Sequence, residues 1–118
     1  YFRSATNDDN VPLIRLAEMH LIRAEANARA AGAGVLTNSQ IIDDINIIRV
    51  RAGLPSLLIT NLATNQAALT EILQQRRLEL AFEHDRFFDL VRWGIAAQVL
   101  NQYIAVEKTR RPFLFLKN

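Results

Sequence analysis

The densest run of potentially reactive side chains lies between Gln75 and Gly94. Two carboxylates in this run, Glu79 and Glu83, are four positions apart and would share one face of a helix. Such a pair could act as a general acid and base, or could bind a metal ion together with the adjacent His84. The first question is therefore whether these carboxylates do chemistry or hold the fold together.

Arginines around both carboxylates favour the structural answer. Arg76 lies one turn before Glu79. Arg86 follows Glu83 by three positions. Neighbouring guanidinium groups favour an ionised carboxylate, whereas a general acid must carry its proton near neutral pH. We therefore predict a structural ion-pair network that fixes the angle between two helices, with the members Arg76, Glu79, Glu83, Arg86, Asp89 and Arg92.

The two histidines carry no pattern that predicts catalysis. His84 lies where a helix should end, and we expect it to adopt the left-handed conformation of a helix cap. His20 lies on an apolar helical stripe, where we expect a satisfied core histidine, because no cluster of His, Cys or carboxylate residues accompanies it. The sequence has no cysteine, no glycine-rich phosphate loop and no nucleophile elbow. We predict neither an enzyme, nor a metal site, nor a cofactor.

Three aromatic side chains follow the carboxylates. Phe87, Phe88 and Trp93 could form a flat platform on which a sugar ring stacks, but their alternation with Leu90 and Val91 favours core positions. We expect most of these rings to be buried.

Charge and hydropathy exclude two classes of partner. The chain has 14 basic and 12 acidic residues, which leaves a net charge of only +2 and predicts no nucleic-acid partner. The basic end formed by Lys108, Arg110 and Arg111 is typical of a solvated loop. No apolar run approaches the length of a transmembrane helix.

Helical periodicity accounts for most of the chain. We predict helices from Pro12 to about Ala31, from a Thr37/Gln40 capping box to Ala52, from Gln66 to Glu83, from Phe87 to Gly94 and from Ile95 to about Val106. Only the run Phe113 to Leu116 resembles a strand. The predicted fold is all-α, one domain over residues 1–118, built from antiparallel helix pairs joined by short loops.

The ends of the chain suggest that it is part of a longer protein. It starts at Tyr1 without a methionine and stops after an apolar run, so we interpret it as a fragment. The apolar face of Ile41, Ile45 and Ile48, with the connector 54–65, looks larger than a fragment can cover, and we expect partial exposure there.

Three ordered blocks closely resemble the carboxy-terminal helical region of the SusD/RagB family, outer-membrane nutrient-binding lipoproteins of Bacteroidetes. Leu16–Ala26 resembles R-x-A-E-x-x-L-x-x-A-E-A, and Ile45–Pro55 resembles N-x-I-R-x-R-A-G-L. The run 76–94 resembles E-R-R-x-E-L-x-F-E-G-x-R-x-F-D-L-x-R-W, with Gln75 in place of the first Glu and His84 in place of the Gly.

The resemblance implies a TPR-like all-α fold, as in SusD-type proteins, and a function in nutrient uptake. The full-length protein would bind a glycan or another nutrient on the outer face of the outer membrane. An N-terminal lipid anchor, absent from this fragment, would attach it to the membrane, and a SusC-like TonB-dependent transporter would be its partner. Family members are not enzymes, and their ligand-contacting residues lie mostly outside these blocks, so the ligand-binding residues stay unknown.

This segment would then be mainly a helical scaffold and a transporter-contact region. The alternative is a TPR-like module that binds only proteins and has no small-molecule ligand.

Overall fold

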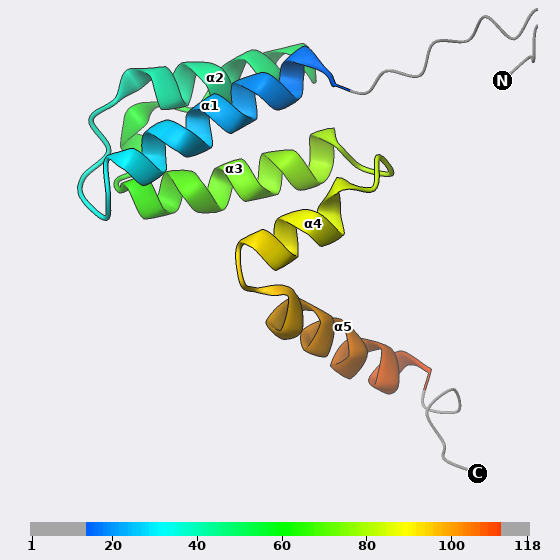
Figure 1. The fold of residues 1–118 in the computed structure, drawn as a ribbon. Helices are drawn as coiled ribbons and strands as arrows, with labels where there is room; N and C mark the ends of the chain where they lie inside the picture. The colour runs from blue at the N-terminus through cyan, green and yellow to red at the C-terminus, as the bar shows by residue number, and fades with distance from the viewer. Residues whose placement is uncertain (1–13, 112–118) are drawn as a thin grey trace, which may run out of the picture. The chain divides into compact units, whose positions relative to one another are not determined.

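The computed structural model describes residues 14–111 of the chain. Within them it contains no strand, and its helices are α1 (Leu16–Ala30), α2 (Ser39–Arg51), the 3₁₀ turn η1 (Ile59–Asn61), α3 (Asn65–Glu79), α4 (Asp85–Arg92) and α5 (Ala96–Arg110) (Figure 1). The predicted all-α fold class is confirmed. The described residues form two compact units, 14–79 and 80–111, so the single domain over 1–118 stays a prediction.

The first unit is a bundle of three helices in which α1 runs antiparallel to both α2 and α3 (Figure 1). Because α2 and α3 run in the same direction, the connector between them must return along the bundle, which for the 13 residues of α2 is about 20 Å. The predicted antiparallel pair with a short loop is therefore confirmed for α1 and α2. Helices α2 and α3 differ from the prediction, because they run in the same direction and a longer connector joins them.

The core of this unit comes from one stripe of each helix. The side chains are at most 8% exposed and are mainly aliphatic: Leu21, Ala24 and Ala28 of α1; Ile41, Ile42, Ile45 and Ile48 of α2; Ala68, Leu69 and Ile72 of α3. The expectation that Ile41, Ile45 and Ile48 are partly exposed is wrong, because α1 and α3 together cover that face. The expected exposure is confirmed for the connector, where Leu54, Leu58 and Ile59 are exposed. Apolar surface is also exposed at Leu16, which is 74% exposed, and at Ile47 and Val50.

Helix α1 begins four residues after the predicted start at Pro12, which lies outside the described residues. Arg15 is the N-cap and has an extended backbone with φ −114° and ψ 146°. Its guanidinium donates to the carbonyl oxygen of Glu79 at 2.7 Å. A contact with a distant helix, and not the local sequence, therefore fixes where α1 starts.

Both ends of α2 have well-defined caps. Its first turn is capped by Asn38, whose Oδ1 accepts from the backbone N–H of Gln40 at 3.0 Å, so the predicted Thr37 capping box is wrong by one residue. Its last turn ends as predicted at Gly53, which has φ +74°. The N–H groups of Gly53 and Leu54 donate to the carbonyls of Val50 and Arg49, the two hydrogen bonds of a Schellman motif.

Two backbone attachments hold the connector against the bundle. Asn46 of α2 donates from Nδ2 to the carbonyl of Leu57 at 2.9 Å and accepts from the Leu57 N–H at 2.7 Å. Farther on, Val35 and Thr64 form an isolated antiparallel bridge between the α1–α2 loop and the start of α3. Thr64 also caps α3 by accepting from the N–H of Ala67.

Helix α3 ends at Glu79, four residues before the predicted end at Glu83. Phe82 and His84 have φ values of 67° and 70°, in the left-handed region that a continuing helix cannot use. The left-handed conformation of His84 is confirmed, although this residue is the N-cap of α4 and does not cap α3. Glu79 and Glu83 consequently do not share one helix.

The second unit contains α4 and α5, which pack against each other at the turn formed by Gly94. The predicted burial of the aromatic rings is wrong for two of the three, because Phe87 is 57% and Phe88 is 69% exposed. In an eight-residue helix only one narrow stripe is covered, and Asp89 and Leu90 occupy it. The two rings meet edge to face, with centroids 6.3 Å apart.

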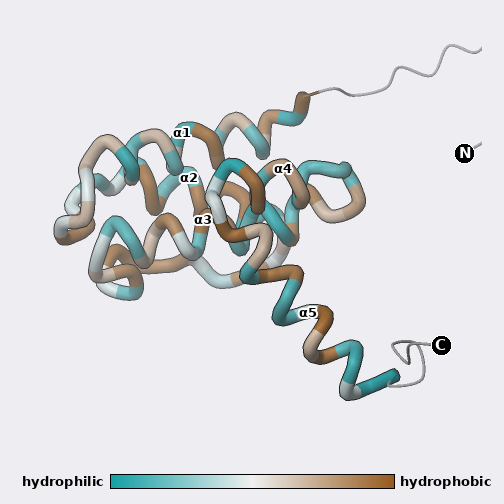
Figure 2. The backbone as a smooth tube through the Cα atoms, turned by 60° about the horizontal axis from the view of Figure 1, so that its bottom comes forward, coloured by the Kyte–Doolittle hydropathy of each residue, from teal (hydrophilic) through white to brown (hydrophobic). Residues whose placement is uncertain are grey.

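The basic end of the described chain belongs to α5. This helix continues to Arg110, beyond the predicted end near Val106, and Glu107 lies 3.7 Å from both Arg110 and Arg111. The predicted solvated loop is thus a solvated helical turn. Figure 2 shows apolar and polar segments alternating along α5, and no helix of residues 14–111 has the length and hydropathy of a membrane span.

We predict that Gly53→Ala destabilises the first unit by about 1–2 kcal/mol, because an L side chain at φ +74° is strained. The matched control is Gly34→Ala, since Gly34 has ordinary φ and open space around its Cα. Urea unfolding followed by circular dichroism measures both free energies. Equal stabilities of the two variants would contradict the assignment of Gly53 as the residue that ends α2.

Candidate functional site

One ionic site of the first unit is the carboxylate of Glu79, whose side chain is only 7% exposed. Arg15 donates from Nη1 to Glu79 Oε1 at 2.9 Å. Arg51 donates from Nη2 to Glu79 Oε1 at 2.6 Å and to Oε2 at 2.5 Å. We call this group the Glu79 clamp, because one carboxylate joins the start of α1, the end of α2 and the end of α3.

Two arginines of the predicted network, Arg76 and Arg92, each have an acidic partner within their own unit. In the first unit, Arg76 is 5% exposed and its Nη2 lies 3.6 Å from Glu18 Oε1 on α1. In the second unit, Arg92 donates from Nε to Asp89 Oδ1 at 2.9 Å, and its guanidinium also lies 5.8 Å from the centroid of the Trp93 ring.

The structure divides the six residues of the predicted network between the two units. Arg76 and Glu79 lie in the first unit, and the second contains Glu83, Arg86, Asp89 and Arg92. Its Asp89–Arg92 pair is present. The expectation that Arg76 is the cation of Glu79 missed Arg15 and Arg51, which lie 64 and 28 positions away in sequence. The network of all six residues as one closed set stays a prediction.

A second ionic site, which the sequence reasoning missed, surrounds Asp44. This side chain on α2 has no exposed surface. Arg23 of α1 donates to it from Nε at 2.9 Å and from Nη2 at 2.5 Å, and His20 Nδ1 lies 2.9 Å from Oδ1. His20 is therefore a hydrogen-bonded histidine, as expected, but the sequence reasoning did not name its partner Asp44. The sequence contains a signal for it, since His20 and Arg23 are one turn apart.

The electrostatics of this site have opposing contributions. Burial raises the pKa of Asp44, but the hydrogen bonds from Arg23 and His20 and the charge of Arg23 outweigh it, so the pKa of Asp44 lies below its ordinary value. The same contact raises the pKa of Arg23. Asp44 is thus a permanently ionised, structurally paired carboxylate at neutral pH, which does not suit it as a proton donor.

Arg49 of α2 and Gln75 of α3 bind the same carboxylate, that of Glu71. Arg49 donates from Nε to the carbonyl of Pro55 at 3.1 Å and from Nη1 to Glu71 at 3.3 Å. Gln75 of α3 donates to the same Glu71 carboxylate at 2.8 Å. Together with Asn46 and Arg51, this places every polar side chain of the second sequence block in a contact that fixes backbone or helix position.

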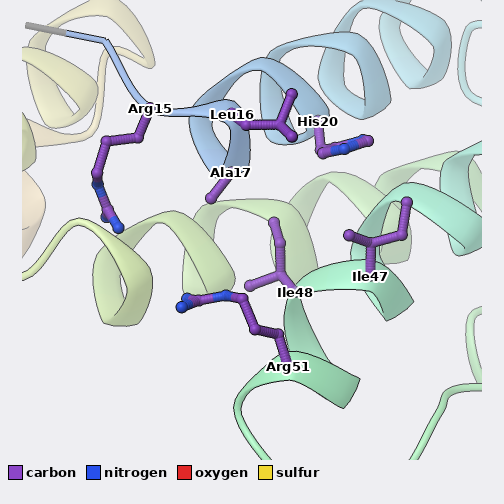
Figure 3. A pocket seen from close by; sticks show the side chains of 7 residues that line it. All are labelled: Arg15, Leu16, Ala17, His20, Ile47, Ile48 and Arg51. Carbon is purple, nitrogen blue, oxygen red and sulfur yellow. The ribbon is translucent and has the colours of Figure 1, made fainter.

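A cavity of about 240 Å³ lies between α1 and α2. Leu16, Ala17, Ile47 and Ile48 give it an apolar lining, and Arg15, Arg51 and His20 supply its polar groups. Figure 3 shows the guanidinium groups of Arg15 and Arg51 on one side and His20 with Ile47 on the other. The lining has no hydroxyl or thiol nucleophile, and residues 14–111 contain no group of three metal-ligating side chains. The arrangement is suited to binding.

We predict that Glu79→Gln destabilises the first unit by about 3 kcal/mol, because the substitution leaves Arg15 and Arg51 facing each other without a carboxylate. Arg51→Met should cost less, since the pair of Arg15 and Glu79 remains. Denaturant unfolding of the wild type and the two variants gives the comparison. A loss from Glu79→Gln no larger than that from Arg51→Met would refute the clamp.

We predict that Asp44→Asn destabilises the chain by about 2 kcal/mol at pH 7, through the loss of its charged hydrogen bonds. The folded pKa of Asp44 is lower than the unfolded value of about 3.9, so its contribution is complete above that value and is lost as the pH falls through the folded pKa. The gap between wild type and variant should therefore narrow below about pH 4.

The control for this pH series is Asp43→Asn, a substitution at the adjacent, exposed carboxylate. Its stability should follow that of the wild type at every pH. If the gap between wild type and Asp44→Asn is as wide at pH 3 as at pH 7, the pairing of Asp44 does not stabilise the folded state.

Comparison with known proteins gives one match. No curated protein and no solved structure matches the chain. The model of the SusD family matches residues 2–113, which include all three sequence blocks. Because this match covers nearly the whole chain, the protein belongs to the SusD family.

Proposed function

We propose that this chain is the helical scaffold of a glycan-binding nutrient-uptake protein and that it contributes the contact region for a SusC-like transporter. The SusD family is a family of binding proteins that are generally associated with the outer membrane. Membership in it supports a function as a glycan-binding component of nutrient uptake. The full-length protein would be held at the outer face of the outer membrane by an N-terminal lipid, as in Bacteroidetes relatives, and would not be an enzyme.

The observation that carries the scaffold role is the Glu79 clamp. Its three residues lie in or next to the three sequence blocks of the family: Arg15 directly precedes the first, Arg51 belongs to the second and Glu79 to the third. Several charged residues of these blocks make contacts between helices, which supports a role in positioning and not in ligand recognition. They are Glu18, Arg23, Arg49, Arg51, Arg76 and Glu79. The glycan would then be bound by parts of the full-length protein outside these blocks.

The alternative is a TPR-like module that binds only proteins. The apolar cavity and the exposed Leu16, Ile47 and Val50 favour it, because exposed apolar surface of this kind is typical of protein-binding faces. The two functions share the scaffold and differ in whether the full-length protein binds a saccharide.

The test is calorimetric titration of the full-length protein with soluble oligosaccharides of several linkage classes, together with co-purification of its transporter. Saccharide binding and transporter association would support the proposal. Transporter association without saccharide binding would favour the protein-only module, and the absence of both would contradict the two functions alike.

The scaffold role is tested in the same assay with Glu79→Gln in the full-length protein, at a temperature where the variant is folded. We expect the saccharide Kd to stay within about twofold of the wild type while the unfolding free energy falls. A large loss of affinity in the folded variant would instead assign Glu79 to the ligand site.

A further inference from the structure

One face of α2 carries a short stripe of largely exposed side chains. Its members are three and four positions apart, and they line a shallow depression: Asp43, Asn46, Ile47, Val50 and Arg51. The two apolar members are well exposed, with Ile47 at 47% and Val50 at 58%. The cavity between α1 and α2 adjoins the depression and shares Ile47 and Arg51 with it (Figure 3). From end to end the stripe spans eight positions of helix, or about 12 Å.

The two ends of the stripe have opposite charges, and each can accept a further partner. Asp43 is exposed, and its carboxylate pairs with no other group of residues 14–111. Arg51 is 61% exposed, and both of its hydrogen bonds to Glu79 come from Nη2. A guanidinium has five N–H donors, so the Nε and Nη1 groups of Arg51 remain for a second carboxylate. The stripe therefore offers an unpaired acid at one end and unused donors at the other, with apolar side chains between them.

This arrangement makes the stripe complementary to itself. Asp43 and Arg51 lie on opposite sides of Ile47, each four positions away. In an antiparallel pair of α2 helices with a two-fold axis at Ile47, Asp43 of each copy comes opposite Arg51 of the other. Such a pair contains two acid–guanidinium contacts, whereas a parallel pair would place like charges beside each other. Charge therefore selects the antiparallel arrangement of two identical stripes.

We propose that two copies of this chain associate through this stripe, as a symmetric antiparallel pair of α2 helices. Ile47 and Val50 of the two copies pack together between the charged pairs. The cavity beside the stripe receives an apolar side chain of the other copy, as a knob enters a hole. The inference goes beyond the proposed function, because it requires neither a saccharide nor the transporter.

The contact is small, because two helical turns bury less than the roughly 1,200 Å² of a stable interface. We therefore expect a weak dimer, with a dissociation constant above about 1 µM. Sedimentation equilibrium of the 118-residue chain should show a monomer that becomes a dimer, and no larger species, as the concentration rises. Added salt should weaken the dimer, because the charged pairs are exposed. A chain that stays monomeric up to about 1 mM would leave the stripe to a different polypeptide and overturn the proposal.

Substitutions at exposed side chains locate the interface. Asp43→Lys places a cation opposite Arg51 twice in each dimer and should weaken association at least about tenfold. Ile47→Asp, at the centre of the stripe, should abolish it. The matched control is Val106→Asp on α5, at a side chain that is 53% exposed, and it should dimerise like the wild type. All three variants should keep the helical circular dichroism of the wild type. A dimer that survives Ile47→Asp would lie on another face and overturn the proposal.

The chain has no cysteine, so a single introduced thiol tests the symmetry directly. In Ile47→Cys the thiols of the two copies face each other across the axis, and mild oxidation should convert the dimer into a disulfide-linked species. The control, Val106→Cys, should remain unlinked under the same conditions. Equal rates of cross-linking in the two variants would indicate random collision and contradict the proposed pair.

Discussion

A single carboxylate with almost no access to water determines how the first three helices meet. Glu79 could not be desolvated without cations nearby, because a buried charge without a partner costs several kcal/mol. Arg15 and Arg51 supply these cations from the beginning of α1 and the end of α2. The ends of all three helices are therefore brought to one point. This contact explains why Arg51 of the second sequence block and Glu79 of the third are charged.

The elements that depend on local chemistry were accessible from the sequence. Apolar periodicity located the helices, and glycines marked the ends of α1, α2 and α4, where positive φ values allow the chain to turn. The boundaries that failed depend on distant residues. Arg15 stays extended because its side chain is held at Glu79, so α1 starts later than the predicted Pro12. No local pattern contains that contact.

The ionic sites also divide into pairs that local spacing predicts and pairs that depend on distant residues. Spacings of three and four positions reveal the pair of Asp89 and Arg92, but not the cations of Glu79, which come from other helices. Asp43 and Asp44 are adjacent and of identical type, and only the position of α1 decides that the second is buried against Arg23. Which of two neighbouring carboxylates is buried is a property of helix packing.

The separation of Arg15 and Glu79 by 64 positions has a consequence for synthesis of the protein. While α3 is still inside the exit tunnel of the ribosome, α1 and α2 can already pair, but Glu79 is not yet available to their terminal arginines. The carboxylate arrives only when the last residue of α3 leaves the exit tunnel. Closing so long a loop is entropically costly until that contact compensates it. The contact that joins the ends of all three helices can therefore form only after Glu79 has left the ribosome.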